Sequence, residues 1–217
     1  MAYTLDIVFS MGRRQPITLQ LFTIKLKFMK IYSPTKLCFI TQGFGTKNTS
    51  PSMMEKYNAI GLSGGHNGID FGLRCKDHQV IHGGQCESVY MNVAGADLTV
   101  ISYQKDDKGG FGINAQDEKG NRYCWWHFDI INPEIQVGTK LTFGQELGVG
   151  GNTGMSTGAH CHFGLYLKDE NKNNGYGGAS NPEPYFDGRF CGDIATQITL
   201  IQKLLEIYKS ILNLWKK

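Results

Sequence analysis

The distribution of glycine constrains the fold of this chain more than any other feature of its sequence. Of the 28 glycines among 217 residues, 26 lie between positions 33 and 190. Glycine weakens helices, whereas it suits tight turns and places where two backbones approach closely. The central part of the chain therefore favours short strands joined by turns over a helical fold.

Short segments rich in β-branched and aromatic residues alternate with these glycines. Each segment is bounded by Gly, Asn or Asp, which is typical of strands. We expect strands within residues 37–45, 66–73, 87–95, 97–104, 122–130 and 160–167. The predicted fold class is mainly all-β.

Three polar stretches rich in Gly and Asn separate some of these segments. They cover residues 45–65, 105–121 and 169–183, and we expect them to be loops. Loops of this length in a compact domain are more often the walls of a binding site than simple spacers.

The charge of +3 is distributed unevenly and divides the chain into three parts. Residues 1–32 form a basic N-terminal extension and residues 33–190 form a mildly acidic central domain, while residues 191–217 are basic again.

Basic and aromatic residues do not interleave as they do in nucleic-acid binders, so no nucleic-acid partner is expected. No apolar run is long enough for a membrane span, and the N-terminus lacks the pattern of a cleaved signal peptide. Translation from Met1 and from Met29 both stay open.

An amphipathic helix is predicted near the C-terminus, over residues 198–215. Its apolar residues follow alternating steps of three and four, as on one face of a helix. They are Ile201, Leu204, Tyr208, Ile211 and Trp215. Docking on the chain's own domain, self-association and contact with a membrane surface are three open interpretations of this stripe.

The six cysteines do not indicate a metal or redox motif, because no two of them are three residues apart. Cys75 and Cys86 are spaced to bridge neighbouring strands. We nevertheless expect reduced thiols that pack as small apolar residues.

Two compact motifs carry the chemistry. His66 and Asp70 stand four residues apart in GGHNGIDFG, where Gly64, Gly65 and Gly68 are expected to provide a bend that brings the two side chains together. His160 and His162 stand two apart in a predicted strand, so both point to the same face.

His66, Asp70 and His162 would supply two nitrogens and one oxygen. Three protein ligands and an open water position are how catalytic zinc is held, and zinc makes the bound water a nucleophile at neutral pH. A further histidine is needed to move protons and to stabilise the oxyanion. His160 and His127, in YCWWHFD, are the two candidates.

The sequence resembles the M23 family of zinc metallopeptidases, the lysostaphin/LytM-type peptidoglycan endopeptidases. The elements that carry the resemblance are ITQGFG (40–45), GHNGIDFG (65–72), WWHFD (125–129) and LGVGGNTGMSTGAHCHFGLY (147–166). It covers about residues 33–187, and the last motif is highly specific.

The resemblance implies a strongly twisted antiparallel β-sheet with the site in a groove between long loops. It makes His66, Asp70 and His162 the ligands of one Zn²⁺ per chain and makes His127 and His160 the catalytic pair. The implied substrate is bacterial peptidoglycan, cut in its stem peptides or cross-bridges. The absence of a signal-peptide pattern and the single module resemble a phage or prophage endolysin that reaches the cell wall after release. The alternative is a non-catalytic module of the same fold that binds peptidoglycan or a partner and uses zinc structurally.

Two positions depart from the family pattern. Cys161 stands where Leu is usual, and we expect it to face the core. Trp125 stands where Tyr is usual, which keeps a ring and loses a hydroxyl.

Overall fold

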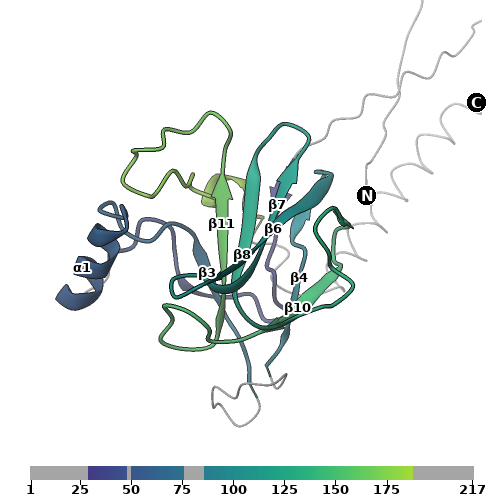
Figure 1. The fold of residues 1–217 in the computed structure, drawn as a ribbon, viewed down its shortest axis with the longest axis horizontal. Coiled ribbons are helices and arrows are strands. Elements are labelled where there is room, and N and C mark those ends of the chain that lie inside the picture. The colour runs from purple at the N-terminus through teal and green to yellow at the C-terminus, as the bar shows by residue number, and fades with distance from the viewer. Residues whose placement is uncertain (1–28, 48–49, 76–85, 188–217) are drawn as a thin grey trace, which may run out of the picture.

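The computed structural model describes residues 29–47, 50–75 and 86–187. The elements that form the centre of the molecule are as follows: β2 (Phe39–Gln42), α1 (Pro51–Ala59), β3 (Ile69–Gly72), β6 (Leu98–Asp106), β7 (Gly110–Asp117), β8 (Arg122–Ile131) and β11 (His160–Tyr166). The smaller elements are β1 (Lys30–Ile31), β4 (Ser88–Tyr90), β5 (Val93–Ala94), β9 (Lys140–Leu141), β10 (Glu146–Gly150) and the 3-10 helix η2 (Glu183–Tyr185). Figure 1 shows the strands crossing the middle of the molecule, with α1 standing apart on one side.

Most of these strands form one twisted sheet of nine, in the order β2-β3-β11-β8-β7-β6-β9, with β10 paired to β8 and β4 paired to β10. Every pairing between its strands is antiparallel. A separate pair joins β1 to β5. The prediction of a mainly β fold built from antiparallel strands is confirmed.

Each of the six expected strand segments overlaps at least one strand, but two expected loops contain regular structure. The stretch 105–121 holds all of β7, which pairs with β6 on one side and β8 on the other. The loop prediction failed there because Gly109 and Gly112 were interpreted as turn residues. In the structure a Cβ on Gly112 would lie 2.4 Å from Cδ1 of Trp126, so this glycine makes room for an indole ring. The stretch 45–65 holds α1, whose only buried residue is Tyr57.

Alternation along the strands separates a core face from a site face. On β11, Cys161, Phe163 and Leu165 are fully buried in the apolar core, which confirms the expectation that Cys161 faces inward. Trp125 on β8 is also fully buried, and its indole Nε1–H donates to Oδ1 of Asn92 at 2.9 Å. The neighbouring residues therefore point to the other face of the sheet.

The register of four strands places a row of side chains across that other face. Gln42 on β2 pairs with Asp70 on β3, Asp70 pairs with His162 on β11, and His162 pairs with Trp126 on β8. Side chains directly opposite one another in an antiparallel pair are about 5 Å apart at their Cβ atoms. The sheet alone thus brings Asp70 and His162 into contact.

The last residues of the expected N-terminal extension, 29–32, belong to the described fold. Ile31, from the segment expected to be the N-terminal extension, lies in β1 and is fully buried in the core. The helix expected over residues 198–215 lies outside the described residues. No helix among the described residues is long and apolar enough to cross a membrane.

The cysteines differ in part from the expectation of reduced thiols. Cys75 and Cys86 form a disulfide, so that expectation is wrong for this pair. Cys38 is also disulfide-bonded. Cys124 and Cys161 are buried free thiols, as expected.

Candidate metal centre

Three ligand atoms converge on one face of the sheet. Asp70 Oδ1 lies 2.9 Å from His162 Nδ1 and 3.1 Å from His66 Nε2, and the two histidine nitrogens lie 3.0 Å apart. All three residues are buried. Among the described residues, this is the one group of three or more His, Cys, Asp or Glu side chains arranged to hold a metal ion.

His66 comes from the loop before β3 and not from the strand itself. Its backbone N–H donates to Thr46 O at 3.0 Å, and its carbonyl accepts from Gly45 N at 2.8 Å. Gly65 has φ 116°, a conformation that a side chain would strain, and a Cβ there would lie 2.7 Å from Gly45 O. The bend expected from the glycines is therefore made at Gly65.

Gly68 has a different role from the expected one. It does not have a positive φ. A Cβ on Gly68 would lie 2.5 Å from Phe163 O and 2.6 Å from Cε1 of His162. Gly68 is thus required because the backbone passes directly against the His162 ring.

The hydrogen bond made by one ring nitrogen of His66 determines what the other ring nitrogen presents to the cluster. His66 Nδ1 lies 3.0 Å from the carbonyl of Gly43. A carbonyl only accepts, so Nδ1 carries the hydrogen and Nε2 presents its lone pair to Asp70 and His162. Such outer hydrogen bonds orient the histidine ligands of metal sites.

The electrostatics of the cluster favour one carboxylate and a neutral imidazole at neutral pH. Burial alone would raise the pKa of Asp70, but its interactions with His162 and His66 outweigh burial and hold that pKa well below its usual range. Burial lowers the pKa of His162 to about 4, against the opposing effect of Asp70. A carboxylate beside neutral imidazole nitrogens is a ligand set for a divalent cation.

His160 lies next to the three ligand atoms without joining them. Its Nε2 is 3.6 Å from Asp70 Oδ2, beyond hydrogen-bond distance. Its Nδ1 lies 2.8 Å from Gly158 O and 3.1 Å from Ser156 Oγ. The Gly158 carbonyl fixes the hydrogen on Nδ1, which leaves the Nε2 lone pair open. Ser156 supports the loop before His160, because its hydroxyl also donates to Gly158 O at 2.8 Å.

His127 lies beside His160 in a strained backbone position. The two rings have centroids 4.5 Å apart. His127 has φ 68°, and it sits where the register of β8 against β7 shifts between Phe111 and Ile113. A non-glycine residue with this φ costs about 1–3 kcal/mol and is held by its surroundings. Here the backbone N–H of His127 donates to Gly109 O at 3.1 Å.

Thr153 fixes the ring of His127 and the strands around it. Its carbonyl accepts from His127 Nδ1 at 2.6 Å, so Nε2 is again the nitrogen left open. Its hydroxyl donates to Phe128 O at 2.8 Å and accepts from Phe111 N at 3.0 Å. Burial, together with the neighbouring His160 and His162, lowers the pKa of His127 to about 3, so its imidazole is neutral at neutral pH.

All five residues line one cavity of about 260 Å³ between α1 and the turn that joins β6 to β7. Tyr57 of α1 lines the same cavity, and its hydroxyl is hydrogen-bonded to the side chain of Gln42. Burial and the nearby Asp70 raise the pKa of Tyr57, so its hydroxyl keeps its proton and can donate.

The structure brings together every residue named from the sequence: His66, Asp70, His127, His160 and His162. It adds Tyr57 and Thr153, which the sequence analysis missed. Tyr57 stands in a polar stretch with no apolar period, so no local signal marks it. Thr153 stands within the motif GNTGMSTGAHCH, but its contacts to β7 and β8 depend on the tertiary fold.

No family model matches the sequence, and no curated protein matches it. Solved structures do match. Lysostaphin, an antimicrobial peptidase from Staphylococcus simulans, is 21% identical with a TM-score of 0.50, over 71% of this chain and 53% of that one. The chain therefore spans about half of that protein.

Two shorter structures match over most of their own length. The catalytic domain of lysostaphin is 21% identical with a TM-score of 0.46, over 67% of this chain and 90% of that one. The catalytic domain of the prophage-encoded M23 protein EnpA from Enterococcus faecalis is 19% identical with a TM-score of 0.44, over 68% and 90%. The antiparallel β-sheet and the match to lysostaphin lead to one conclusion: this chain has the fold of the lysostaphin-type M23 peptidases.

Proposed function

We propose that this chain is a zinc-dependent endopeptidase that hydrolyses peptide bonds in the stems or cross-bridges of bacterial peptidoglycan. One observation carries the proposal. Three buried ligand atoms converge beside two histidines whose Nε2 atoms are open, all within one cavity.

The ligand set fits zinc. Bonds of about 2.05 Å in a tetrahedral site place neighbouring ligand atoms about 3.3 Å apart. The three separations here are 2.9, 3.0 and 3.1 Å, so a small outward movement of the side chains gives that spacing. His66, Asp70 and His162 would hold the ion. Bound zinc supplies a water of lowered pKa and polarises the scissile carbonyl.

The chain's own residues would then handle the protons. His160 Nε2 lies next to the ligand set, so it is placed to accept a proton from a nucleophilic water. His127, adjacent to it, is placed to stabilise the tetrahedral intermediate or to pass a proton to the leaving amine. The Tyr57 hydroxyl is a further donor in the cavity.

We also propose an endolysin role, in which the protein reaches the cell wall after release. The basic, amphipathic pattern of residues 198–215, outside the described residues, supports contact with an anionic envelope. Purified protein added to intact and to permeabilised cells of the same bacterium tests this. Lysis of the permeabilised cells, with or without lysis of the intact cells, supports a wall-directed enzyme. If neither preparation lyses, the endolysin role is contradicted.

Two variants test the assignment of roles. His160→Ala should keep stoichiometric zinc and lose hydrolysis, because His160 is not a ligand. His162→Ala should lose both. Zinc content by atomic absorption and new amino termini released from purified sacculi are the two measurements. Hydrolysis by His160→Ala at the parent rate would contradict the assignment.

A further inference from the structure

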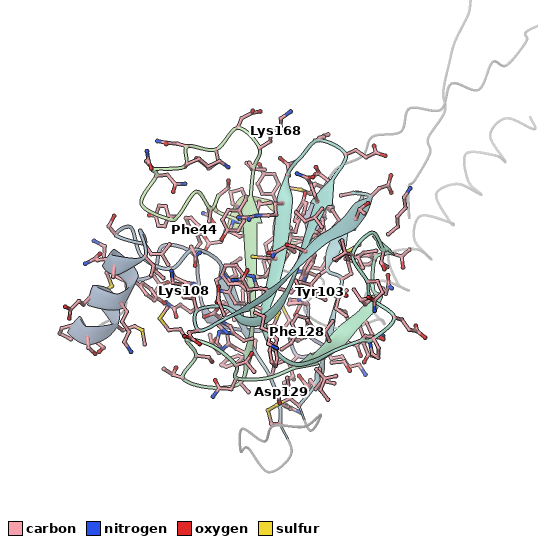
Figure 2. All side chains as sticks on the ribbon, in the orientation of Figure 1. Phe44, Tyr103, Lys108, Phe128, Asp129 and Lys168 are labelled. Atoms are coloured by element: carbon pink, nitrogen blue, oxygen red, sulfur yellow. A yellow bond between two sulfur atoms is a disulfide. The ribbon has the colours of Figure 1, made fainter. Side chains whose placement is uncertain are left out.

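Lys108 is the one Lys or Arg side chain among the described residues that line the cavity. Figure 2 places it at the turn between β6 and β7, on the side of the sheet toward α1. The residue is exposed, and its ammonium group makes no ion pair with another described residue. Lys108 is therefore a positive charge at the edge of the cavity that no described acidic side chain pairs with.

The backbone that carries Lys108 is fixed against the two histidines. Asp106 Oδ1 accepts from the N–H groups of Lys108 and Gly109, at 2.8 Å each. The carbonyl of Lys108 accepts from Met155 N at 2.8 Å, and that of Gly109 accepts from His127 N at 3.1 Å. The base of the side chain thus has a set position relative to His127.

Both acids that line the cavity are already used by other groups. The carboxylate of Asp106 is taken by its own turn, because it also accepts from the Gln104 amide. Asp70, the other acid that lines the cavity, belongs to the ligand set. Met53, Ile60 and Leu62, from α1 and the residues after it, contribute apolar surface. A carboxylate for Lys108 must come from outside the cavity.

The two kinds of peptidoglycan cross-link differ in whether they carry a carboxylate beside the linked amine. A glycine bridge carries no ionisable side chain. In a direct cross-link between D-Ala and a diamino acid of the dicarboxylic kind, a free carboxylate stays next to the linked amine. We propose that Lys108 binds this carboxylate, so that the site favours directly cross-linked stem peptides over glycine bridges. The inference rests on the proposed peptidase function and narrows its substrate.

Two synthetic substrates that differ in one group provide the test. Both are cross-linked stem peptides with a D-Ala–diamino-acid bond, and one has the free carboxylate where the other has a carboxamide. The zinc-loaded parent should hydrolyse the carboxylate form with a kcat/KM about fivefold higher, the factor expected for a solvent-accessible ion pair. The ratio should fall toward one in Lys108→Met, survive in Lys108→Arg, and decrease as salt is added.

Lys119→Met is the matched control. Lys119 lies in the turn at the opposite end of β7 and does not line the cavity, so the same loss of charge there should leave the ratio at the parent value. A parent that hydrolyses both forms equally, or a Lys108→Met variant that keeps the full ratio, would overturn the inference and leave the peptidase function intact.

Failure of the proposed function gives a different result. If the zinc-loaded parent hydrolyses neither form, the peptidase proposal is wrong. Calorimetric binding of the two uncleaved substrates to the parent and to Lys108→Met then still decides whether Lys108 recognises the carboxylate. Equal affinities for both forms would overturn the inference.

Discussion

Replacing Thr153 with Val should destabilise the protein and impair hydrolysis without removing the metal. Thr153 joins three parts of the fold: its hydroxyl bridges Phe111 N on β7 and Phe128 O on β8, and its carbonyl accepts from His127 Nδ1. Valine has almost the same shape but no hydroxyl. The change therefore removes both bridging hydrogen bonds and little packing.

The expected loss can be estimated from the two groups left without a partner. Phe128 is fully buried, so its carbonyl costs about 1–3 kcal/mol when unpaired. Phe111 is exposed, and water can reach its N–H group, so about 1 kcal/mol is expected there. The free energy of unfolding should fall by about 2–4 kcal/mol in total. For a domain of this size the Tm should fall by about 5–10 °C.

Urea unfolding of the metal-free protein measures this loss, with Thr153→Ser as the control because serine keeps the hydroxyl. Zinc content should be unchanged in both variants, since the hydrogen bonds of Thr153 go to Phe111, Phe128 and His127 and to none of the three ligands. We expect kcat to fall about tenfold in Thr153→Val, because the backbone of residue 153, whose carbonyl holds His127 Nδ1, is no longer tied to β7 and β8. The reasoning is refuted if the Val variant unfolds at the same urea concentration as the Ser variant.

Three further changes have defined outcomes. In Gly68→Ala, the added Cβ would press on the His162 ring, so the zinc affinity, measured by competition with a chelator, should fall at least tenfold. The control Gly158→Ala should bind zinc normally, because a Cβ at position 158 meets nothing within 4 Å. Folding lowers the pKa of His127 from 6.5 to about 3, so below pH 6.5 the unfolded state binds a proton that the folded state does not, and stability decreases as pH falls. His127→Gln should therefore reduce the slope of unfolding free energy against pH by about 1.4 kcal/mol per pH unit at pH 5–6 in the metal-free protein. An unchanged slope would contradict the lowered pKa. Zinc at about 100 times its dissociation constant should stabilise the parent by about 2.7 kcal/mol and leave Asp70→Ala unaffected, as calorimetric melting would show.

The sequence predicted the part of the site that depends on local geometry. Alternation in a strand is enough to place His160 and His162 on one face and Cys161 on the other. The glycines around His66 indicated a bend, although the structure makes it at Gly65 and uses Gly68 for space. These inferences needed only the periodicity of a strand and the conformational range of glycine.

The parts that escaped prediction depend on tertiary contacts. β7 was interpreted as a loop because its glycines are also turn residues, whereas Gly112 is small to accommodate Trp126. Cys75 and Cys86 form a bond that their spacing permitted but did not require. Lys108 is one of 22 basic residues, and only the fold shows that it stands at the edge of the cavity.

Zinc-dependent release of amino termini from purified peptidoglycan tests the central claim most directly. The metal-free protein and the same protein loaded with one equivalent of zinc are incubated with sacculi of both cross-link types, and new amino groups are counted and the products weighed by mass spectrometry. We predict release only by the zinc-loaded form. Stoichiometric zinc binding with no new amino terminus from either type would contradict the claim and would favour a binding module that holds zinc for structure.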